Sequence, residues 1–524
     1  MPGEVRVDGE SLTPAGVEAV AREGAAVAVP EVARDRVRES RARVEDVVDS
    51  GEAVYGVNTG FGELVRERIS QDDIGDLQRN LLRSHAAGTG RELTTEEVRA
   101  MLVTRLNALV KGYSGIRERA IDLLVAMLNE RVHPIVPEKG SLGASGDLAP
   151  LAHLALVAIG EGEARVDGDR LPGDAALACR GLDPIDLRAK EGLALINGTQ
   201  LTVGLGALVV RDAERAVRAA DIAGALTTEV TMGTTAAAHP RINDVRPHEG
   251  HAESARNVRV LTAGSGIVES HRNCDRIQDA YSVRCLPQVH GAVRDAVSHL
   301  RSVVETELNS ATDNPLVFDA DAVDDRASGT DTAAILSGGN FHGEPLALPL
   351  DYVTSALAEL GAIAERRVDR MLNPEIQEDH LPPFLTEGSG LKSGYMIAQY
   401  TAADLVSSTR NLGRPSTDNV PVSGNQEDHV SMSAQSARLA REAVENTLHV
   451  VATELVCATQ ALDFVDDGLA PGDGTGAAAA LVREHVPHLD ADRPVAEDVE
   501  ATRDLVTGDA LFERVGSAVD AELA

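Results

Sequence analysis

Ser145 is the first residue that suggests chemistry, because it lies between small residues in the stretch Gly143-Ala144-Ser145-Gly146-Asp147. A hydrolase nucleophile is the obvious hypothesis. The elbow motif G-x-S-x-G, however, requires glycine at position 147, where this chain has an aspartate. A phosphate-binding loop requires Gly-Lys-Ser/Thr after its glycines, and the segment lacks that sequence too. The segment fits neither chemistry.

A different reaction suits these residue types. A sharp bend at Ala144-Ser145-Gly146 brings the amide nitrogen of Gly146 to the carbonyl carbon of Ala144, and attack closes a five-membered ring. Loss of water from the ring and from the Ser145 side chain leaves an exocyclic methylidene, which is a strong electrophile. Gly146 has no Cβ to block its nitrogen and can adopt strained dihedral angles. Taken alone, however, most Ala-Ser-Gly tripeptides are ordinary turns.

Six further motifs accompany the tripeptide. In chain order the seven are YGVNTGFG at 55–62, SH at 84–85, ASG at 144–146, NGTQ at 197–200, QDAYSVR at 278–284, GGNF at 338–341 and NQEDH at 425–429. Together they resemble the aromatic amino-acid ammonia-lyases, a family that carries a methylidene-imidazolone prosthetic group. The resemblance extends from about residue 55 to about residue 432, and seven motifs in family order do not arise by chance.

The resemblance implies how the electrophile forms and which groups move protons. It implies a methylidene-imidazolone made autocatalytically from Ala144, Ser145 and Gly146, with no external cofactor and no metal. Ammonia is a poor leaving group and the β-hydrogen is barely acidic, so the site needs an electrophile for the amine and a base at the β-carbon. The resemblance implies Tyr55 as that base and Tyr281 as a group that assists proton transfer near the electrophile.

Four more residues receive roles by resemblance. Arg284 is implied to bind the substrate carboxylate through a bidentate pair, which lysine cannot match. Asn197 and Gln278 are implied to support that clamp and the electrophile, and Phe341 is implied to pack against the substrate ring. Taken singly, an arginine is more often a surface ion-pair residue and an asparagine before glycine is more often a turn.

His85 and Glu427 bear on which amino acid is the substrate. A phenyl ring would leave a buried carboxylate unpaired, which is costly, whereas an imidazole can hydrogen-bond to both a carboxylate and a histidine. The NQEDH motif at 425–429 also resembles the version found in family members that act on histidine. We therefore expect elimination of ammonia from L-histidine to give trans-urocanate, the first step of histidine degradation.

Three alternatives remain open at this point. Another lyase or an aminomutase of the same family would require an apolar pocket in place of His85 and Glu427. The fumarase/aspartase group also eliminates ammonia, without a prosthetic group, but has no need of Tyr55 or the NQE sequence at 425–427. A helical scaffold without activity would be expected to lose Ser145, Tyr55 or Arg284, and this chain has all three.

Long helices must position these motifs. Apolar residues recur at steps of three and four over 289–304, 350–371 and 444–462, which marks one face of a helix. We expect an all-α fold: a long-helix bundle of the fumarase/aspartase type (201–524) and a loop-rich N-terminal domain (1–200) that carries the electrophile. The acidic, Gly/Ala-rich stretch 466–480 is predicted to be a surface loop.

Composition restricts partners and compartment. The formal net charge of −34 argues against nucleic acid and anionic membrane as partners. The four cysteines form no CxxC pair, so neither a disulfide framework nor a zinc site is indicated. The first residues show no signal-peptide pattern and no apolar run reaches the length of a membrane span, so we expect a cytoplasmic protein. The resemblance adds a homotetramer in which each active site is assembled from three chains.

The acidity predicts dependence on salt. The 49 basic residues include only four lysines, so acidic groups dominate a surface with few ammonium groups. The Debye length falls from ~30 Å at 0.01 M salt to ~3 Å at 1 M, so repulsion within and between subunits is strong only in dilute buffer. We expect low salt to dissociate or unfold the protein and molar salt to protect it, as measured by melting curves and size-exclusion chromatography across salt concentrations. Equal stability and an unchanged oligomer in dilute buffer would instead assign the composition to genomic codon bias.

Overall fold

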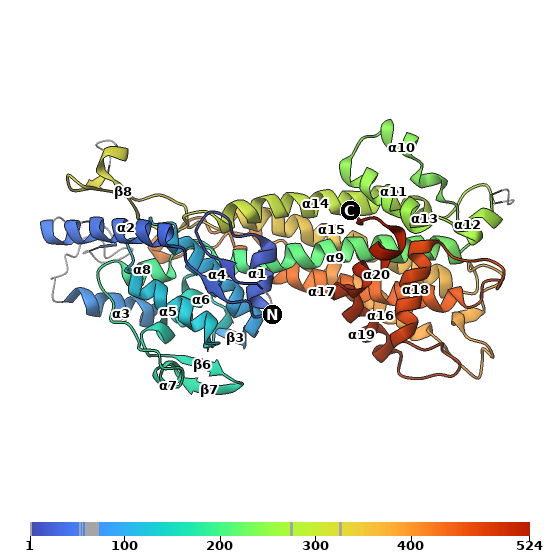
Figure 1. Cartoon of the computed structure of the whole chain (residues 1–524), viewed down its shortest axis with the longest axis horizontal. Coiled ribbons are helices and arrows are strands. Elements are labelled where there is room, and N and C mark those ends of the chain that lie inside the picture. Colours follow the sequence, from blue (N-terminus) through green and yellow to red (C-terminus); the bar gives the residue numbers. More distant parts are fainter. Residues whose placement is uncertain (1–2, 52–53, 55, 58–72, 273–275, 324–326) are drawn as a thin grey trace. The chain divides into compact units, whose positions relative to one another are not determined.

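The computed structural model describes residues 3–51, 54, 56–57, 73–272, 276–323 and 327–524 (Figure 1). The chain forms two compact units, each built from three separate segments. Unit 1 comprises Met1–Arg211, Leu300–Asp351 and Arg414–Arg438, and unit 2 comprises Asp212–His299, Tyr352–Gly413 and Leu439–Ala524. The division into domains 1–200 and 201–524 stays a prediction, because these units describe compactness alone.

Helices make up most of both units. Those of unit 1 are α1 (Pro14–Ala21), α2 (Glu31–Ser50), α3 (Ile74–His85), α4 (Thr95–Val110), α5 (Glu118–Asn129), α6 (Leu148–Ala158), α7 (Gly173–Ala178) and α8 (Glu191–Ile196), with the short turns η4 (Ala320–Ala322), η6 (Pro415–Thr417) and η7 (Ser423–Asn425). Those of unit 2 are α10 (Pro240–Asp244), α11 (Glu249–Leu261), α12 (Gly266–Ser270), α13 (Tyr281–Arg284), α16 (Met396–Arg410), α18 (Asp473–His485), α19 (Val495–Thr507) and α20 (Ala510–Val519), with η3 (Thr235–Ala238) and η5 (Pro383–Leu385). The long helices α9 (Gln200–Val230), α14 (Leu286–Leu308), α15 (Glu344–Leu372) and α17 (Ser433–Leu462) contribute residues to both units.

The strands are short and lie in unit 1. They are β1 (Val5–Arg6), β2 (Val27–Ala28), β3 (Thr89–Glu92), β4 (His133–Pro134), β5 (Pro137–Lys139), β6 (Glu163–Val166), β7 (Asp169–Pro172), β8 (Leu316–Asp319), β9 (Ser328–Gly329) and β10 (Ala333–Leu336). They form small sheets in the orders β1-β2, β8-β10-β9, β3-β5 and β4-β6-β7. Among the strands of the described residues, β1 and β2 pair in parallel, with Val5 opposite Val27. Helices therefore dominate the described residues, and the expected all-α class is confirmed.

The apolar periodicity located three of the long helices correctly. The runs 289–304, 350–371 and 444–462 lie in α14, α15 and α17, and most of their apolar side chains are buried. Helix α15 ends at Leu372, directly before Asn373-Pro374, where proline cannot continue a helix. The predicted surface loop at 466–480 was partly wrong. Residues from Asp473 onward form α18, because the alanines that follow favour a helix and bury one of its faces.

Buried charges connect the long helices inside unit 2. On α15, Nε and Nη2 of Arg367 donate to the carboxylate of Glu454 on α17 at 2.5 and 2.8 Å, and both side chains are fully buried. The guanidinium of Arg367 also donates to Nε2 of His290 on α14, whose Nδ1 lies 2.7 Å from Asp221 on α9. Burial would raise the pKa of Asp221, but the hydrogen bond from His290 and nearby positive charge outweigh it and lower that pKa. All four side chains are buried from solvent, so each depends on the others for its hydrogen bonds.

Helix α4 is an interior helix of unit 1 that also carries buried charged side chains. A capping box begins it: the amide of Glu97 donates to Oγ1 of Thr94, and the amide of Thr94 donates to the Glu97 carboxylate. From Glu97 to Val110 every residue of α4 is buried, which is typical of an interior helix. The helix nevertheless carries two buried arginines, Arg99 and Arg105. Arg99 donates to backbone oxygens of neighbouring segments, and Nη1 of Arg105 donates to a backbone oxygen and a side-chain oxygen, whereas its Nε and Nη2 have no hydrogen-bond partner among the described residues.

One helix has the length and composition of a membrane span. Among the described residues, α15 passes this test, and 61% of its most apolar window is buried in the protein. A core helix of a globular protein shows the same properties, so this helix is weak support for a membrane location. The absence of a membrane partner stays a prediction.

The Arg367–Glu454 pair yields a stability prediction. Glu454→Ala leaves a buried guanidinium without its carboxylate, so we expect a loss of about 3–5 kcal/mol in the free energy of unfolding and a clearly lower melting temperature. Denaturant and thermal unfolding measure both. Glu484→Ala is the control, because Glu484 pairs with Arg514 at the surface of the same unit and its loss should leave the melting curve unchanged. Equal effects of the two substitutions would contradict the importance of the buried pair.

Candidate active site

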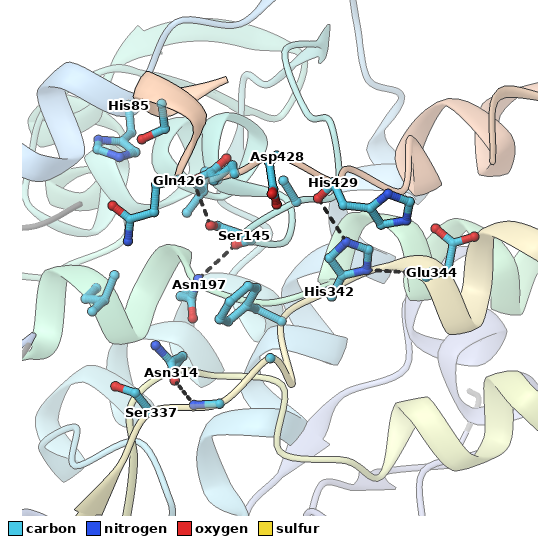
Figure 2. Close-up of a pocket in the computed structure, with 18 of the residues that line it drawn as sticks. His85, Ser145, Asn197, Asn314, Ser337, His342, Glu344, Gln426, Asp428 and His429 are labelled. Atoms are coloured by element: carbon cyan, nitrogen blue, oxygen red, sulfur yellow. Dashed lines mark hydrogen bonds between the residues drawn. The ribbon is translucent and has the colours of Figure 1, made fainter. Parts of the chain in front are cut away.

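A cavity of about 1120 Å³ opens beside Ser145 in unit 1 (Figure 2). Its wall combines the end of α3, the turn before α6, the end of α8, the stretch before α15 and the turn around η7. The residues that line it include His85, Ala144, Ser145, Asn197, Asn314, Ser337, Phe341, His342, Glu344, Gln426, Glu427, Asp428 and His429. Segments far apart in the sequence therefore meet around the tripeptide that the sequence singled out.

Gly146 lies where two backbone segments touch. Its φ is +75°, and it pairs with Gly198 in an isolated parallel bridge. A Cβ at position 146 would lie 2.3 Å from the carbonyl oxygen of Gly198, so no side chain fits there. The amide of Asp147 donates to that same oxygen at 2.7 Å. The bend at 144–146 is thus held by backbone contacts that require glycine.

The side chain of Asp147 holds this bend in place through buried hydrogen bonds. Its carboxylate is fully buried and accepts hydrogen bonds from Oγ of Ser141 at 2.7 Å and from the amide of Thr202 at 2.8 Å. Burial raises the pKa of Asp147, and these hydrogen bonds oppose the rise. Because Thr202 lies in the first turn of α9, Asp147 ties the tripeptide to that helix.

Asn197 and Glu427 both hydrogen-bond to Ser145. Nδ2 of Asn197 donates to the carbonyl oxygen of Ser145 at 2.8 Å, and Oγ of Ser145 donates to Oε1 of Glu427 at 3.0 Å (Figure 2). Asn197 follows α8, whereas Glu427 follows η7. A carboxylate and a carboxamide therefore lie at the hydroxyl and the carbonyl of one serine.

His85 ends α3 and presents one ring nitrogen as an acceptor. Its Nδ1 lies 2.9 Å from the carbonyl oxygen of Leu81, and a carbonyl can only accept, so Nδ1 carries the proton. Burial lowers the pKa of His85, which keeps the ring neutral at pH 7. Nε2 is then unprotonated, and the side chain lines the cavity. It can accept a hydrogen bond from an N–H group of a ligand.

Two histidines of the cavity wall received no role from the sequence. The rings of His342 and His429 stack with centroids 5.7 Å apart and planes 6° apart. Nε2 of His342 donates to the carbonyl oxygen of His429 at 3.3 Å, and its Nδ1 accepts from the amide of Glu344 (Figure 2). His342 directly follows Phe341, and His429 ends the NQEDH motif that contains Glu427. Their places beside these motif residues were the sequence signal that could have identified them.

Three expected residues that the structure describes do not line this cavity. Gln278, Tyr281 and Arg284 belong to unit 2, where all three are exposed and Arg284 donates to Oε1 of Gln278. Tyr55, the expected base, lies outside the described residues. The structure thus groups His85, Ala144, Ser145, Asn197, Phe341 and Glu427 around one cavity, with Gly146 behind it. In the described part of the chain, no cluster of three or more His, Cys, Asp or Glu side chains could hold a metal ion.

Comparisons with known proteins agree with this geometry. The family model for aromatic amino acid lyases matches residues 12–484. The chain is 63% identical, over 99% of both chains, to a probable histidine ammonia-lyase of Halobacterium salinarum. The crystal structure of histidine ammonia-lyase from Trypanosoma cruzi is similar with a TM-score of 0.89 at 39% identity, covering 98% of this chain and 95% of that one. Tyrosine aminomutase from Streptomyces globisporus is similar with a TM-score of 0.91 at 40% identity, covering 99% and 100%. A family-model match over most of the chain shows that this protein belongs to the aromatic amino acid lyase family.

Proposed function

We propose that this protein is a histidine ammonia-lyase, which eliminates ammonia from L-histidine to give trans-urocanate. The observation that carries the proposal is the placement of Glu427 against Ser145 in a cavity that His85 also lines. A carboxylate and a neutral imidazole acceptor suit the N–H groups of an imidazole ring, whereas an apolar ring would offer neither of them a hydrogen bond. The histidine ammonia-lyases among its relatives support the same substrate.

The residues at 144–146 fit the prosthetic group of the family. Ala144 is small and buried, Ser145 supplies a hydroxyl, and Gly146 occupies a bend with no room for a Cβ. A methylidene-imidazolone formed autocatalytically from these three residues would supply an electrophile for the substrate amine. Asn197 would hold the carbonyl of residue 145 in place, as it does in this structure.

The other side chains bind and orient the substrate. Glu427 and His85 would hold the imidazole ring, and Phe341 would pack against it at the cavity wall. Arg284 would bind the carboxylate with support from Gln278, which already accepts a hydrogen bond from it. We assign Tyr55 as the base for the β-proton and Tyr281 as a second group that handles protons, both on the strength of their motifs.

We further propose that the enzyme is a cytoplasmic homotetramer whose active sites combine residues of three chains. The exposure of Tyr281 (73%) and of its neighbour Ile277 (94%) supports this, because large apolar side chains so exposed are typical of surfaces that a partner covers. The cavity of about 1120 Å³ also exceeds the roughly 300–1,000 Å³ of most ligand sites, which leaves space for groups from other chains.

The alternatives are less well supported. Membership of the aromatic amino acid lyase family removes the fumarase/aspartase group, and a scaffold without activity has no need of the Ser145–Glu427 and Ser145–Asn197 contacts. An aminomutase or a lyase for phenylalanine or tyrosine would place polar groups, His85 and Glu427, against an aromatic ring with fewer N–H donors. These enzymes remain the alternative outcomes of the substrate test.

The first test removes the hydroxyl of Ser145. The native protein should convert L-histidine into a conjugated acid, and its own ultraviolet absorption should bleach with borohydride against a background free of tryptophan. Ser145→Ala should lose both properties and keep its melting temperature, because no methylidene can form. Ser337→Ala, which removes another hydroxyl from the cavity wall, should keep both. Substantial turnover by Ser145→Ala would refute the prosthetic group, and preference for tyrosine or phenylalanine would refute the substrate.

The second test concerns Arg284. Arg284→Lys replaces a bidentate fork by a point charge, so KM for L-histidine should rise about tenfold or more. Histamine, which lacks the carboxylate, should be a poor substrate of the native enzyme. Arg272→Lys is the matched control, because Arg272 is also an exposed arginine of unit 2 and pairs with Glu269. Efficient deamination of histamine, or equal kinetics of the two variants, would contradict the assigned role.

A further inference from the structure

Behind the Asn197 turn, on the side away from the cavity, lies the buried guanidinium of Arg105. This side chain comes from α4 and is 1% exposed. Its Nη1 donates to the backbone oxygen of Asn197 at 2.8 Å and to Oε1 of Gln200 at 2.7 Å. One nitrogen therefore joins both ends of the segment 197–200, which is one of the seven motifs.

The turn packs directly onto this guanidinium. Gly198 has φ +143°, and a Cβ built on it would lie 2.8 Å from Nη1 of Arg105 and 2.5 Å from Oε1 of Gln200. Nε2 of Gln200 in turn donates to Oγ1 of Thr312 at 2.7 Å. The Asn197 backbone is thus held by hydrogen-bonded partners, and the turn packs so closely on them that no side chain fits at position 198.

The charge of Arg105 is only partly compensated. The nearby carboxylate of Asp313 bonds to Nζ of Lys190 at 2.7 Å, and both of these side chains are buried. Burial lowers the pKa of Arg105 to about 10, so the guanidinium keeps its charge at neutral pH. A buried charge placed where an apolar side chain would fit is costly to retain, which argues for a use beyond packing.

We propose that Arg105 is a positioning residue for the reaction: it fixes the Asn197 turn so that Nδ2 of Asn197 meets the carbonyl of Ser145 and the Gly198 oxygen meets the amide of Asp147. The link has two steps, from the guanidinium to the Asn197 backbone and from the Asn197 side chain to Ser145. Arg105 itself does not line the cavity. This inference rests on the proposed lyase function for its kinetic part and on the geometry alone for the rest.

Arg99 offers a matched control on the same helix. It is 4% exposed, and it donates to the backbone oxygens of Val20 at 2.7 Å and Leu128 at 2.9 Å. It therefore has the burial and the carbonyl acceptors of Arg105, but none of its partners belongs to the cavity wall. A purely structural role would make the two arginines equivalent.

The kinetic experiment compares Arg105→Met and Arg105→Lys with Arg99→Met and Arg99→Lys. Misplacing a catalytic group by about 1 Å costs on the order of 100-fold in rate, so we expect kcat of Arg105→Met to fall about 100-fold with little change in KM. Arg105→Lys retains a donor and should recover part of the loss, and both Arg99 variants should keep the native kcat. Similar kcat values for the Met variants of Arg105 and Arg99 would overturn the proposal.

A double variant tests whether Arg105 acts through Asn197. If it does, the loss of kcat in Arg105→Met combined with Asn197→Ala should be clearly smaller than the product of the two single losses, because the side chain to be positioned is already absent. Independent losses that multiply would overturn the proposal.

Hydrogen exchange gives a readout that needs no activity. The amide of Asp147 bonds to the Gly198 oxygen, so its exchange should accelerate in Arg105→Met and, to a smaller extent, in Arg105→Lys, and remain native in the Arg99 variants. Unchanged exchange at Asp147 in Arg105→Met would overturn the proposal. A native protein without lyase activity would instead refute the proposed function, while exchange would still decide the role of Arg105.

Discussion

The backbones of Gly146 and Gly198 approach so closely that a Cβ on either residue would overlap its neighbours. This contact joins two segments that are far apart in the sequence, and several other features of the site follow from it. It sets the bend of the tripeptide, places Asn197 against the carbonyl of Ser145, and brings the amide of Asp147 to the Gly198 oxygen. Because buried peptide groups need partners, the two segments satisfy one another only in this arrangement.

Both units have charged side chains in their interiors, and the charges serve different ends. In unit 2, Arg367 and Glu454 neutralise each other between two long helices. In unit 1, Arg105 donates to neutral oxygens and keeps an incompletely balanced charge behind the proposed catalytic turn. Such interior interactions are screened little by salt, whereas the acidic surface is screened strongly. We therefore expect salt to act on the stability of the protein and on its proposed assembly, and the chemistry of the cavity to be nearly indifferent to salt.

Among the described residues, the cavity in unit 1 contains only part of the groups that the proposed reaction needs. It offers groups suited to an imidazole ring and to the tripeptide, namely His85, Asn197 and Glu427, while the arginine implied for the substrate carboxylate is exposed in unit 2. A site assembled from several chains accounts for that exposure without any change of fold. Such a site would also explain why the residues for the imidazole ring and the arginine for the carboxylate lie in separate parts of the sequence.

Much of the proposed function could be predicted from the sequence, because the chemistry requires particular residue types at particular positions along the chain. Ala144, Ser145 and Gly146, together with six ordered motifs, predicted the prosthetic group, and apolar periodicity predicted α14, α15 and α17. Periodicity succeeds there because one face of a helix must be buried over many turns. The alanine-rich part of α18 was missed, since glycine and acidic residues beside it suggested a loop.

Tertiary structure alone decided which of the predicted residues meet. The stacking of His342 on His429, the anchoring of Asp147 on Thr202 and the contact of Arg105 with Asn197 join segments 55 to 92 positions apart. Such pairs cannot be predicted from local sequence. The sequence pattern around an arginine on an apolar helix is the same whether the arginine binds a surface carboxylate or a buried carbonyl. The motifs determined what chemistry the protein can perform, and the packing of helices decided which backbone and side-chain groups hold that chemistry in position.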